Sequence, residues 1–226
     1  PDFFSHSEFI TAVAPNCCGV VNFNGNTTLN DIFVLSSGSV GGVGTVAAGS
    51  GLTGAGGTIT RTVGVTVGGA AALTGGSVLL DAALTANGAF TATGTTLNLS
   101  SAGVLTLNGV DDKVITGGTV TNNGLVNLAG SGALRLNDGA VFNNPGSFDI
   151  QSDAGVLHTA GAGASFTNSG IVMKSGGAGT SGVSPSPIVR PSRGWCAVRS
   201  RRALLRARRV VAADAEPAVA ERLERD

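Results

Sequence analysis

Three short stretches, VTNNG at residues 120–124, FNNPG at residues 142–146 and FTNSG at residues 166–170, place an apolar residue, Asn and Gly at alternate positions. Their central asparagines are Asn122, Asn144 and Asn168, so the stretches recur at a nearly constant spacing. A repeat of about 20 to 25 residues is typical of a solenoid, in which each repeat is one turn that buries its apolar face by stacking on its neighbours. The pattern favours a stacked β architecture over a fold built around an enzyme pocket.

The residues after each glycine predict a strand: LVNL at residues 125–128, SFDI at residues 147–150 and IVMK at residues 171–174. Alternate residues of a strand face opposite sides. Aligning the copies on their glycines therefore predicts inward ladders made of Val126, Phe148 and Val172, with Leu128 and Ile150 two residues further on. Lys174 interrupts the second ladder, so either it faces outward on a shifted register or the regular stack ends there.

The corners of the turns are expected at the Asn and Gly positions of the repeats, which are Asn122, Gly124, Asn144, Gly146, Asn168 and Gly170. Asn and Gly tolerate the positive φ angles that tight corners need. The composition agrees with this arrangement: the chain of 226 residues has 36 Gly, nine Phe, one Trp and no Tyr. Such a mixture suits a thin core of small and β-branched side chains in many short strands.

Other strands are expected at residues 21–23, 28–35, 58–60 and 63–67, where apolar and polar residues alternate or short apolar runs occur. A second strand per turn is indicated at residues 133–136 and 155–157. With about 22 residues per turn, roughly seven turns fit between residues 20 and 183.

The chain divides into an irregular segment at residues 1–19, the solenoid at residues 20–183 and an Arg-rich tail at residues 184–226. Residues 1–189 hold four basic and nine acidic groups, a net charge of −5, whereas residues 190–226 hold ten Arg and five acidic groups, a net charge of +5. Asn and Thr disappear from the tail, and its Arg and Ala favour helix. We expect a partly helical or disordered tail, read from the gene out of frame, in a chain that is a fragment of a longer protein.

The solenoid region resembles the β-strand-repeat regions of bacterial surface and secreted proteins of the filamentous-haemagglutinin and autotransporter-passenger type. The segments that carry the resemblance are GGTVTNNG (117–124), LRLNDGAVFNN (134–144), FDIQ (148–151) and KSGGAGTS (174–181). The resemblance implies a right-handed parallel β-helix that serves as a structural or adhesive rod outside the cell or on its surface. Its implied partners are neighbouring repeats of a longer parent chain and host or environmental surface glycans.

Few residues point to chemistry, and we predict no catalytic residue, metal ligand or cofactor. Asp111 and Asp112 are adjacent carboxylates followed by Lys113 in an expected loop, and the aromatic residues of a sugar-cleaving cleft are missing around them. His6 and His158 are too few for a zinc site on their own. The glycines of residues 49–54 match a dinucleotide fingerprint, but the helix that must follow is absent from the sequence pattern.

Two alternatives to a structural module remain open. One is a polysaccharide-acting β-helix enzyme, which needs an acidic cluster on one face. The other is an ice- or surface-binding solenoid, which needs a flat array of Thr across several turns. Thr58, Thr60 and Thr62 would give one short outward row, without aligned copies in the next turns, so ordinary strand chemistry is favoured there. Nucleic-acid binding and a transmembrane segment are not expected. The sequence assigns no role to Cys17, Cys18 and Cys196.

Overall fold

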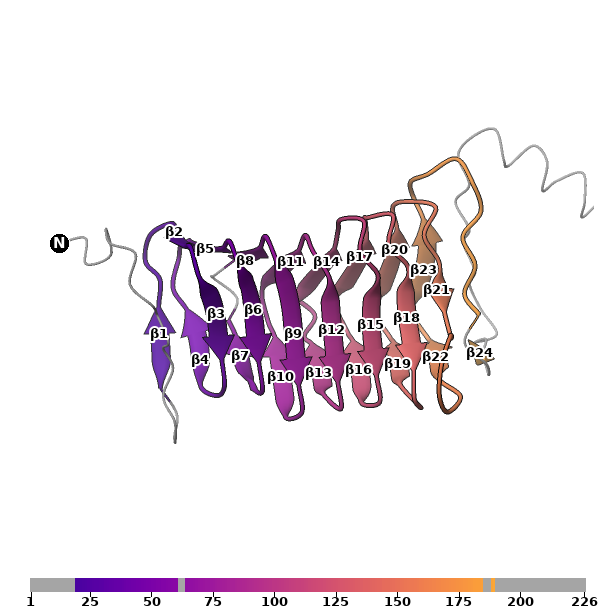
Figure 1. The fold of residues 1–226 in the computed structure, drawn as a ribbon, viewed down its shortest axis with the longest axis horizontal. Helices are drawn as coiled ribbons and strands as arrows, with labels where there is room; N and C mark the ends of the chain where they lie inside the picture. Colours follow the sequence, from indigo (N-terminus) through magenta and orange to yellow (C-terminus); the bar gives the residue numbers. More distant parts are fainter. Residues whose placement is uncertain (1–18, 61–63, 185–187, 190–226) are drawn as a thin grey trace, which may run out of the picture.

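A computed structural model describes residues 19–60, 64–184 and, as backbone alone, 188–189. These residues form a parallel β-solenoid of about seven turns, drawn in Figure 1 with the rungs stacked along the long axis of the molecule. Each turn gives one strand to each of three parallel sheets. The described residues contain no helix, so the expected all-β parallel solenoid is confirmed.

Sheet A contains β1 (Val20–Asn22), β4 (Ser39–Gly41), β7 (Gly57–Ile59), β10 (Ser77–Leu80), β13 (Thr96–Leu99), β16 (Thr119–Asn122), β19 (Val141–Asn144), β22 (Ser165–Asn168) and β24 (Ile188–Val189). Sheet B contains β2 (Thr27–Leu29), β5 (Thr45–Ala48), β8 (Gly64–Val67), β11 (Ala83–Ala86), β14 (Val104–Leu107), β17 (Leu125–Leu128), β20 (Ser147–Ile150) and β23 (Ile171–Lys174). Sheet C contains β3 (Ile32–Leu35), β6 (Gly51–Gly54), β9 (Ala70–Thr74), β12 (Phe90–Thr93), β15 (Lys113–Thr116), β18 (Leu134–Asn137) and β21 (Val156–Leu157).

Three strands per turn are one more than the sequence indicated, because the residues before each corner asparagine form strands of sheet A. The stretch at residues 28–35, expected as one strand, is divided between β2 and β3. A corner at Asn30 and Asp31 separates the two strands. A run in which apolar and polar residues alternate has the same pattern whether it forms one strand or two strands joined by a corner. The sequence therefore did not predict this corner.

The turns differ in length along the rod. In sheet A, Val20 of the first turn pairs with Ser39, whereas Phe142 near the other end pairs with Phe166, so the offset in sequence is larger in the late turns. Since the strands keep similar lengths throughout, the added residues lie in the corners. The early turns are therefore shorter than the spacings of 22 and 24 residues between the three repeat asparagines.

The core is a set of inward ladders in which side chains of successive turns stack in register. In sheet B, one ladder contains Val46, Val65, Leu84, Leu105, Val126, Phe148 and Val172, all buried. Small residues such as Gly54 and Ala71 alternate with larger ones such as Leu52 and Phe90 in sheet C. This alternation lets side chains from three sheets fill a narrow interior at high packing density.

The stack continues beyond β23. Val183 forms a parallel bridge with Val156, and β24 pairs with β22 in sheet A. β24 therefore lies inside the segment 184–226 that the sequence separated as a tail. Residues 1–18 and 190–226, which include the expected helical stretches of the tail, lie outside the described part of the chain. Among the described residues, no helix has the length and apolar character needed to cross a membrane.

Candidate functional site

The three repeat asparagines form a buried ladder. Asn122, Asn144 and Asn168 are the last residues of β16, β19 and β22 and face the interior. Nδ2 of Asn122 donates to Oδ1 of Asn144 at 2.6 Å, and Nδ2 of Asn144 donates to Oδ1 of Asn168 at 2.6 Å. The same amides donate to the carbonyls of Ser147 and Ile171, at 2.7 and 3.0 Å. Each amide thus ties the end of a sheet A strand to the start of a sheet B strand in the next turn.

The repeat glycines form a column beside this ladder. A Cβ on Gly146 would lie 2.4 Å from the carbonyl oxygen of Gly124, and a Cβ on Gly170 would lie 2.1 Å from that of Gly146. A residue with a side chain would push the corners apart and break the backbone hydrogen bonds between turns. Close stacking of the backbone, rather than a positive φ angle, explains glycine at these three corners.

The predicted core residues lie in the interior of sheet B. Val126, Phe148 and Val172 are partners in successive strands, as are Leu128 and Ile150, and all five are buried. The ring of Phe148 stands edge-on to Phe142 and Phe166, with both centroid distances 5.5 Å, and Phe142 and Phe166 stack at 5.0 Å. These contacts join sheets A and B at the C-terminal half of the rod.

The adjacent carboxylates expected in a loop close a corner of sheet C. Oδ2 of Asp112 pairs with Nε of Arg135 at 2.5 Å, and Oδ1 of Asp112 accepts a hydrogen bond from the backbone N–H of Ala133 at 2.9 Å. The hydrogen bond from Arg135 is the main cause that lowers the pKa of Asp112. A carboxylate held ionised by an arginine on the neighbouring strand serves a structural role and is a poor general acid.

Lys113 corrects the expectation of a loop, because it is the first residue of β15 and its side chain is fully buried. Its ladder partners are Phe90 and Leu134 in the turns on either side. Nζ donates a hydrogen bond to the carbonyl oxygen of Asp111. Burial lowers the pKa of Lys113, and the nearby charges of Asp111 and Asp112 oppose this effect. No sign of this burial is visible in the sequence, since Lys after two aspartates resembles an exposed turn.

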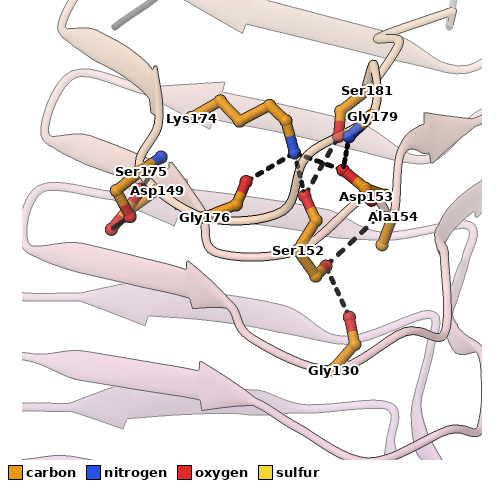
Figure 2. Close-up of polar contacts among 10 residues, drawn as sticks. All are labelled: Gly130, Asp149, Ser152, Asp153, Ala154, Lys174, Ser175, Gly176, Gly179 and Ser181. Carbon is orange, nitrogen blue, oxygen red and sulfur yellow. Dashed lines mark hydrogen bonds and ion pairs between the residues drawn. The ribbon is translucent and has the colours of Figure 1, made fainter. Parts of the chain in front are cut away.

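Lys174 also occupies an inward position, as the partner of Ile150, so the register does not shift at the interrupted ladder. Figure 2 shows its ammonium surrounded by oxygen atoms: Oδ1 of Asp153 lies at 2.9 Å and the carbonyl of Gly176 at 2.6 Å, and the carbonyl of Ser152 also accepts a hydrogen bond from it. Lys174 is thus the polar end of an otherwise apolar ladder in the last described strand of sheet B.

Two carboxylates, those of Asp153 and Asp149, anchor the loop at residues 175–182. Oδ1 of Asp153 accepts a hydrogen bond from the N–H of Gly179 at 2.8 Å, and Asp149 accepts hydrogen bonds from the N–H and hydroxyl of Ser175 at 3.2 and 2.8 Å (Figure 2). Hydrogen bonds from Lys174 are the main cause that lowers the pKa of Asp153. The cluster around Lys174 therefore consists of groups that satisfy one another and fasten a glycine-rich loop to the stack.

The remaining candidates have structural surroundings. Gly51–Gly54 of the glycine pattern at residues 49–54 form β6, a strand of sheet C, and offer no helix N-terminus to a phosphate. Nδ1 of His158 lies 2.9 Å from the carbonyl oxygen of Leu136. No three His, Cys, Asp or Glu side chains in the described ranges are placed together as metal ligands. His6, Thr62 and the three cysteines fall outside those ranges.

The outward face of sheet A has a feature that the sequence analysis missed. Two rows of side chains run along the rod, each residue paired with its neighbour in the next turn. The first row contains Val20, Ser39, Thr58, Leu79, Asn98, Thr121, Asn143 and Thr167. The second row contains Ser77, Thr96, Thr119, Val141 and Ser165. Apart from Val20, Leu79 and Val141, all of these residues carry a hydroxyl or amide group, and none is charged.

The outward face of sheet B has a different character. A row of Ala83, Val104 and Leu125 runs beside a row of Thr85, Thr106 and Asn127. Nδ2 of Asn127 donates to Oγ1 of Thr106 at 3.2 Å, and Asn127 accepts a hydrogen bond from Gln151 at 3.2 Å. The polar row continues with the carboxylate of Asp149. An apolar strip beside a polar strip can contact a ligand that has both kinds of surface.

Comparison of the chain with protein-family models, curated proteins and solved structures gives no match. The side chains that a partner can reach lie on the outward faces of the three sheets.

Proposed function

We propose that the chain is a structural and adhesive module of an extracellular bacterial protein, of the type found in filamentous haemagglutinins and autotransporter passengers. Support comes from the long parallel stack, which extends by adding turns, and from the resemblance of its repeats. In this proposal, neighbouring repeats of a longer chain continue the rod, and the module contacts its target through side chains on the sheets. It performs no catalysis.

The observation that carries the adhesive role is the pair of rows on sheet B. Sugar rings present C–H groups on their faces and hydroxyl groups at their edges. Ala83, Val104 and Leu125 offer an apolar strip for the ring faces, and Thr85, Thr106 and Asn127 offer hydrogen-bonding partners for the edges. Host or environmental glycans are therefore the proposed ligands, each bound weakly at one turn and held by contacts repeated over several turns.

Binding is tested with the full chain and insoluble neutral polysaccharides, such as chitin, cellulose and xylan, in a co-sedimentation assay. Leu125→Lys should reduce the bound fraction because it places a charge on the apolar strip. Thr121→Lys, on sheet A, should bind like the unchanged protein. If neither the unchanged chain nor either variant sediments with any polymer, the glycan proposal is wrong.

The absence of catalysis is tested separately, with soluble pectin, alginate and chitin oligomers. No turnover above background is expected, because Asp112 is ion-paired with Arg135 at 2.5 Å and braces a corner. Turnover that disappears when Asp111→Asn and Asp112→Asn are combined would favour a polysaccharide-acting enzyme instead.

A further inference from the structure

We infer that the outward face of sheet A binds ice. This face is distinct from the sheet B strip of the adhesive proposal and has its own evidence. Of its thirteen row positions, eight in the first row and five in the second, ten carry Ser, Thr or Asn, and the other three are Val20, Leu79 and Val141. The ligand must therefore be one that recognises hydroxyl and amide groups.

These polar groups are available to a ligand. Within the described residues, none of the ten side chains forms a hydrogen bond with another part of the protein. The next residues along the strands behave differently: Oγ1 of Thr60 donates to the carbonyl of Val40 at 2.9 Å, and Nδ2 of Asn123 donates to the carbonyl of Leu99 at 3.0 Å. The corner residues thus stabilise the protein, while the two rows keep their donors and acceptors for the solvent side.

The geometry of the face is regular in two directions. Neighbouring strands of a sheet lie about 4.8 Å apart, and alternate residues along one strand are about 6.6 Å apart. Because the strands are parallel and in register, the rows form a regular array of hydrogen-bonding groups in two directions. A solid with its own fixed repeat, such as ice, can engage many of these groups at once, and the weak contacts then add up.

The chemistry of the face suits ice better than it suits a charged ligand or a sugar ring that stacks on aromatic side chains. Its rows contain no ionised group, so no strongly hydrated charge has to be stripped of liquid water when ice approaches. All six described Phe residues are buried, and none is available to stack on a sugar ring. Threonine contributes a methyl group beside each hydroxyl, which adds apolar contact without interrupting the hydrogen-bonding array.

The polysaccharide alternative is less well matched to sheet A than to sheet B. The three apolar row residues of sheet A, Val20, Leu79 and Val141, are each three turns from the next, so they form no strip. Sheet B places Ala83, Val104 and Leu125 in three consecutive turns. The sheet A array therefore points to a lattice of water rather than to sugar rings.

The experiment uses the full chain and slowly growing ice, with the fraction of protein taken up by the ice as the readout. The unchanged protein should be enriched in ice, whereas Thr121→Lys, in the middle of the first row, should lower the enrichment at least about tenfold through loss of repeated contacts. Thr85→Lys is the matched control, since Thr85 is also a half-buried, outward-facing threonine, on sheet B. Circular dichroism should show the same β signal for all three proteins.

A second readout is the shape and recrystallisation of ice grains, which an adsorbed protein alters and a merely trapped protein does not. Thr121→Ser should retain the effect because it keeps the hydroxyl. Exclusion of the unchanged protein from ice, or equal loss of uptake in Thr121→Lys and Thr85→Lys, would overturn the inference. Loss of polysaccharide binding in Thr121→Lys would also overturn it, by showing that sheet A is the glycan face. Failure of the glycan assay alone would leave the ice proposal standing, because the two proposals depend on different sheets.

Discussion

At the scale of single residues, position within a strand decides whether an asparagine stabilises the protein or faces its surroundings. Asn143 and Asn144 are neighbours in β19, yet Asn144 is fully buried in the amide ladder and Asn143 belongs to the outer row of sheet A. Every buried side-chain nitrogen and oxygen in the described residues has a hydrogen-bond partner. An amide ladder is therefore compatible with a core that has little room for water.

Asn144→Ala should lower the free energy of unfolding by about 1–3 kcal/mol, because Asn122 and Asn168 each lose a buried hydrogen bond. Asn143→Ala, the matched control, should change it by less than about 0.5 kcal/mol. Urea denaturation followed by circular dichroism measures both values. Equal effects of the two substitutions would contradict the inward and outward assignment.

Lys113→Met should stabilise the protein by about 1 kcal/mol or more, since it removes a buried ammonium and keeps the volume of the ladder. Burial lowers the pKa of Lys113 in the folded state below that of the unfolded chain, so the unfolded state binds the proton more tightly. The stability of the unchanged protein should therefore rise with pH between the lowered pKa and the ordinary value of about 10.4.

This alkaline rise should be absent from Lys113→Met. Thermal unfolding at a series of pH values from neutral upward measures it, and Ile115→Met, at the next inward position of β15, controls for the introduction of methionine. A rise that persists in Lys113→Met would have to be assigned to another group.

At the scale of elements, the sequence predicted turns well where corners repeat and poorly where they do not. The copies around Asn122, Asn144 and Asn168 recur because a stacked corner restricts its residues twice, through the amide ladder and through the close approach of Gly146 and Gly170. The shorter early turns have no such marker, and their inward residues include Gly54 and Ala48, which give a weak apolar signal.

The candidate surfaces were only partly readable for a related reason. Aligning TLNL, TVTN, VFNN and SFTN of β13, β16, β19 and β22 would have revealed the rows of sheet A. The pairing of β7 with β10 could not be read in advance, because Thr58 and Leu79 are further apart in sequence than the partners in the turns on either side. An outer row becomes visible only when the register of every turn is known.

One of the contacts that hold the loop at residues 175–182 is the ion pair of Lys174 with Asp153, which can be followed directly. Lys174 lowers the pKa of Asp153, and a carboxylate with a lowered pKa stabilises the fold above its ordinary pKa of about 4 and loses this effect as the pH falls through the lowered value. Lys174→Met should therefore raise the pKa of Asp153 and speed amide exchange at Gly179, whose N–H is bonded to Asp153.

Carbon-13 NMR titration of the carboxylates measures the first effect, and hydrogen exchange measures the second. Lys174→Arg should preserve both properties in large part, and Asp112, which is paired with Arg135, should titrate unchanged in either variant. An unaltered Asp153 in Lys174→Met would show that the ionic contact does not persist in solution.

At the scale of the whole molecule, each turn contacts the turns next to it, so effects of substitution should stay local. Phe148→Ala should cost about 3–5 kcal/mol through the cavity that it leaves among the buried rings. Phe33 lies near the other end of the rod. In the double variant Phe148→Ala with Phe33→Ala, the two losses of unfolding free energy should add to within about 0.5 kcal/mol.

The ring centroid of Phe142 lies 5.5 Å from that of Phe148. In the double variant Phe148→Ala with Phe142→Ala, the losses of unfolding free energy should depart from additivity by about 0.5–3 kcal/mol. Guanidinium denaturation of the single and double variants gives both coupling energies. Strong coupling between Phe33 and Phe148 would mean that the rod does not behave as a chain of neighbouring interactions.

The unequal turns have a practical consequence for how such a chain can change over time. The corner between sheets B and C occupies residues 87–89 in one turn and residues 108–112 in the next, while the strands on both sides keep four residues. A duplication or insertion at a corner can thus be accepted without disturbing the spacing of the faces. The spacing of the strands stays constant while the corners vary in length. The corners are therefore suitable sites for grafting foreign peptides for display.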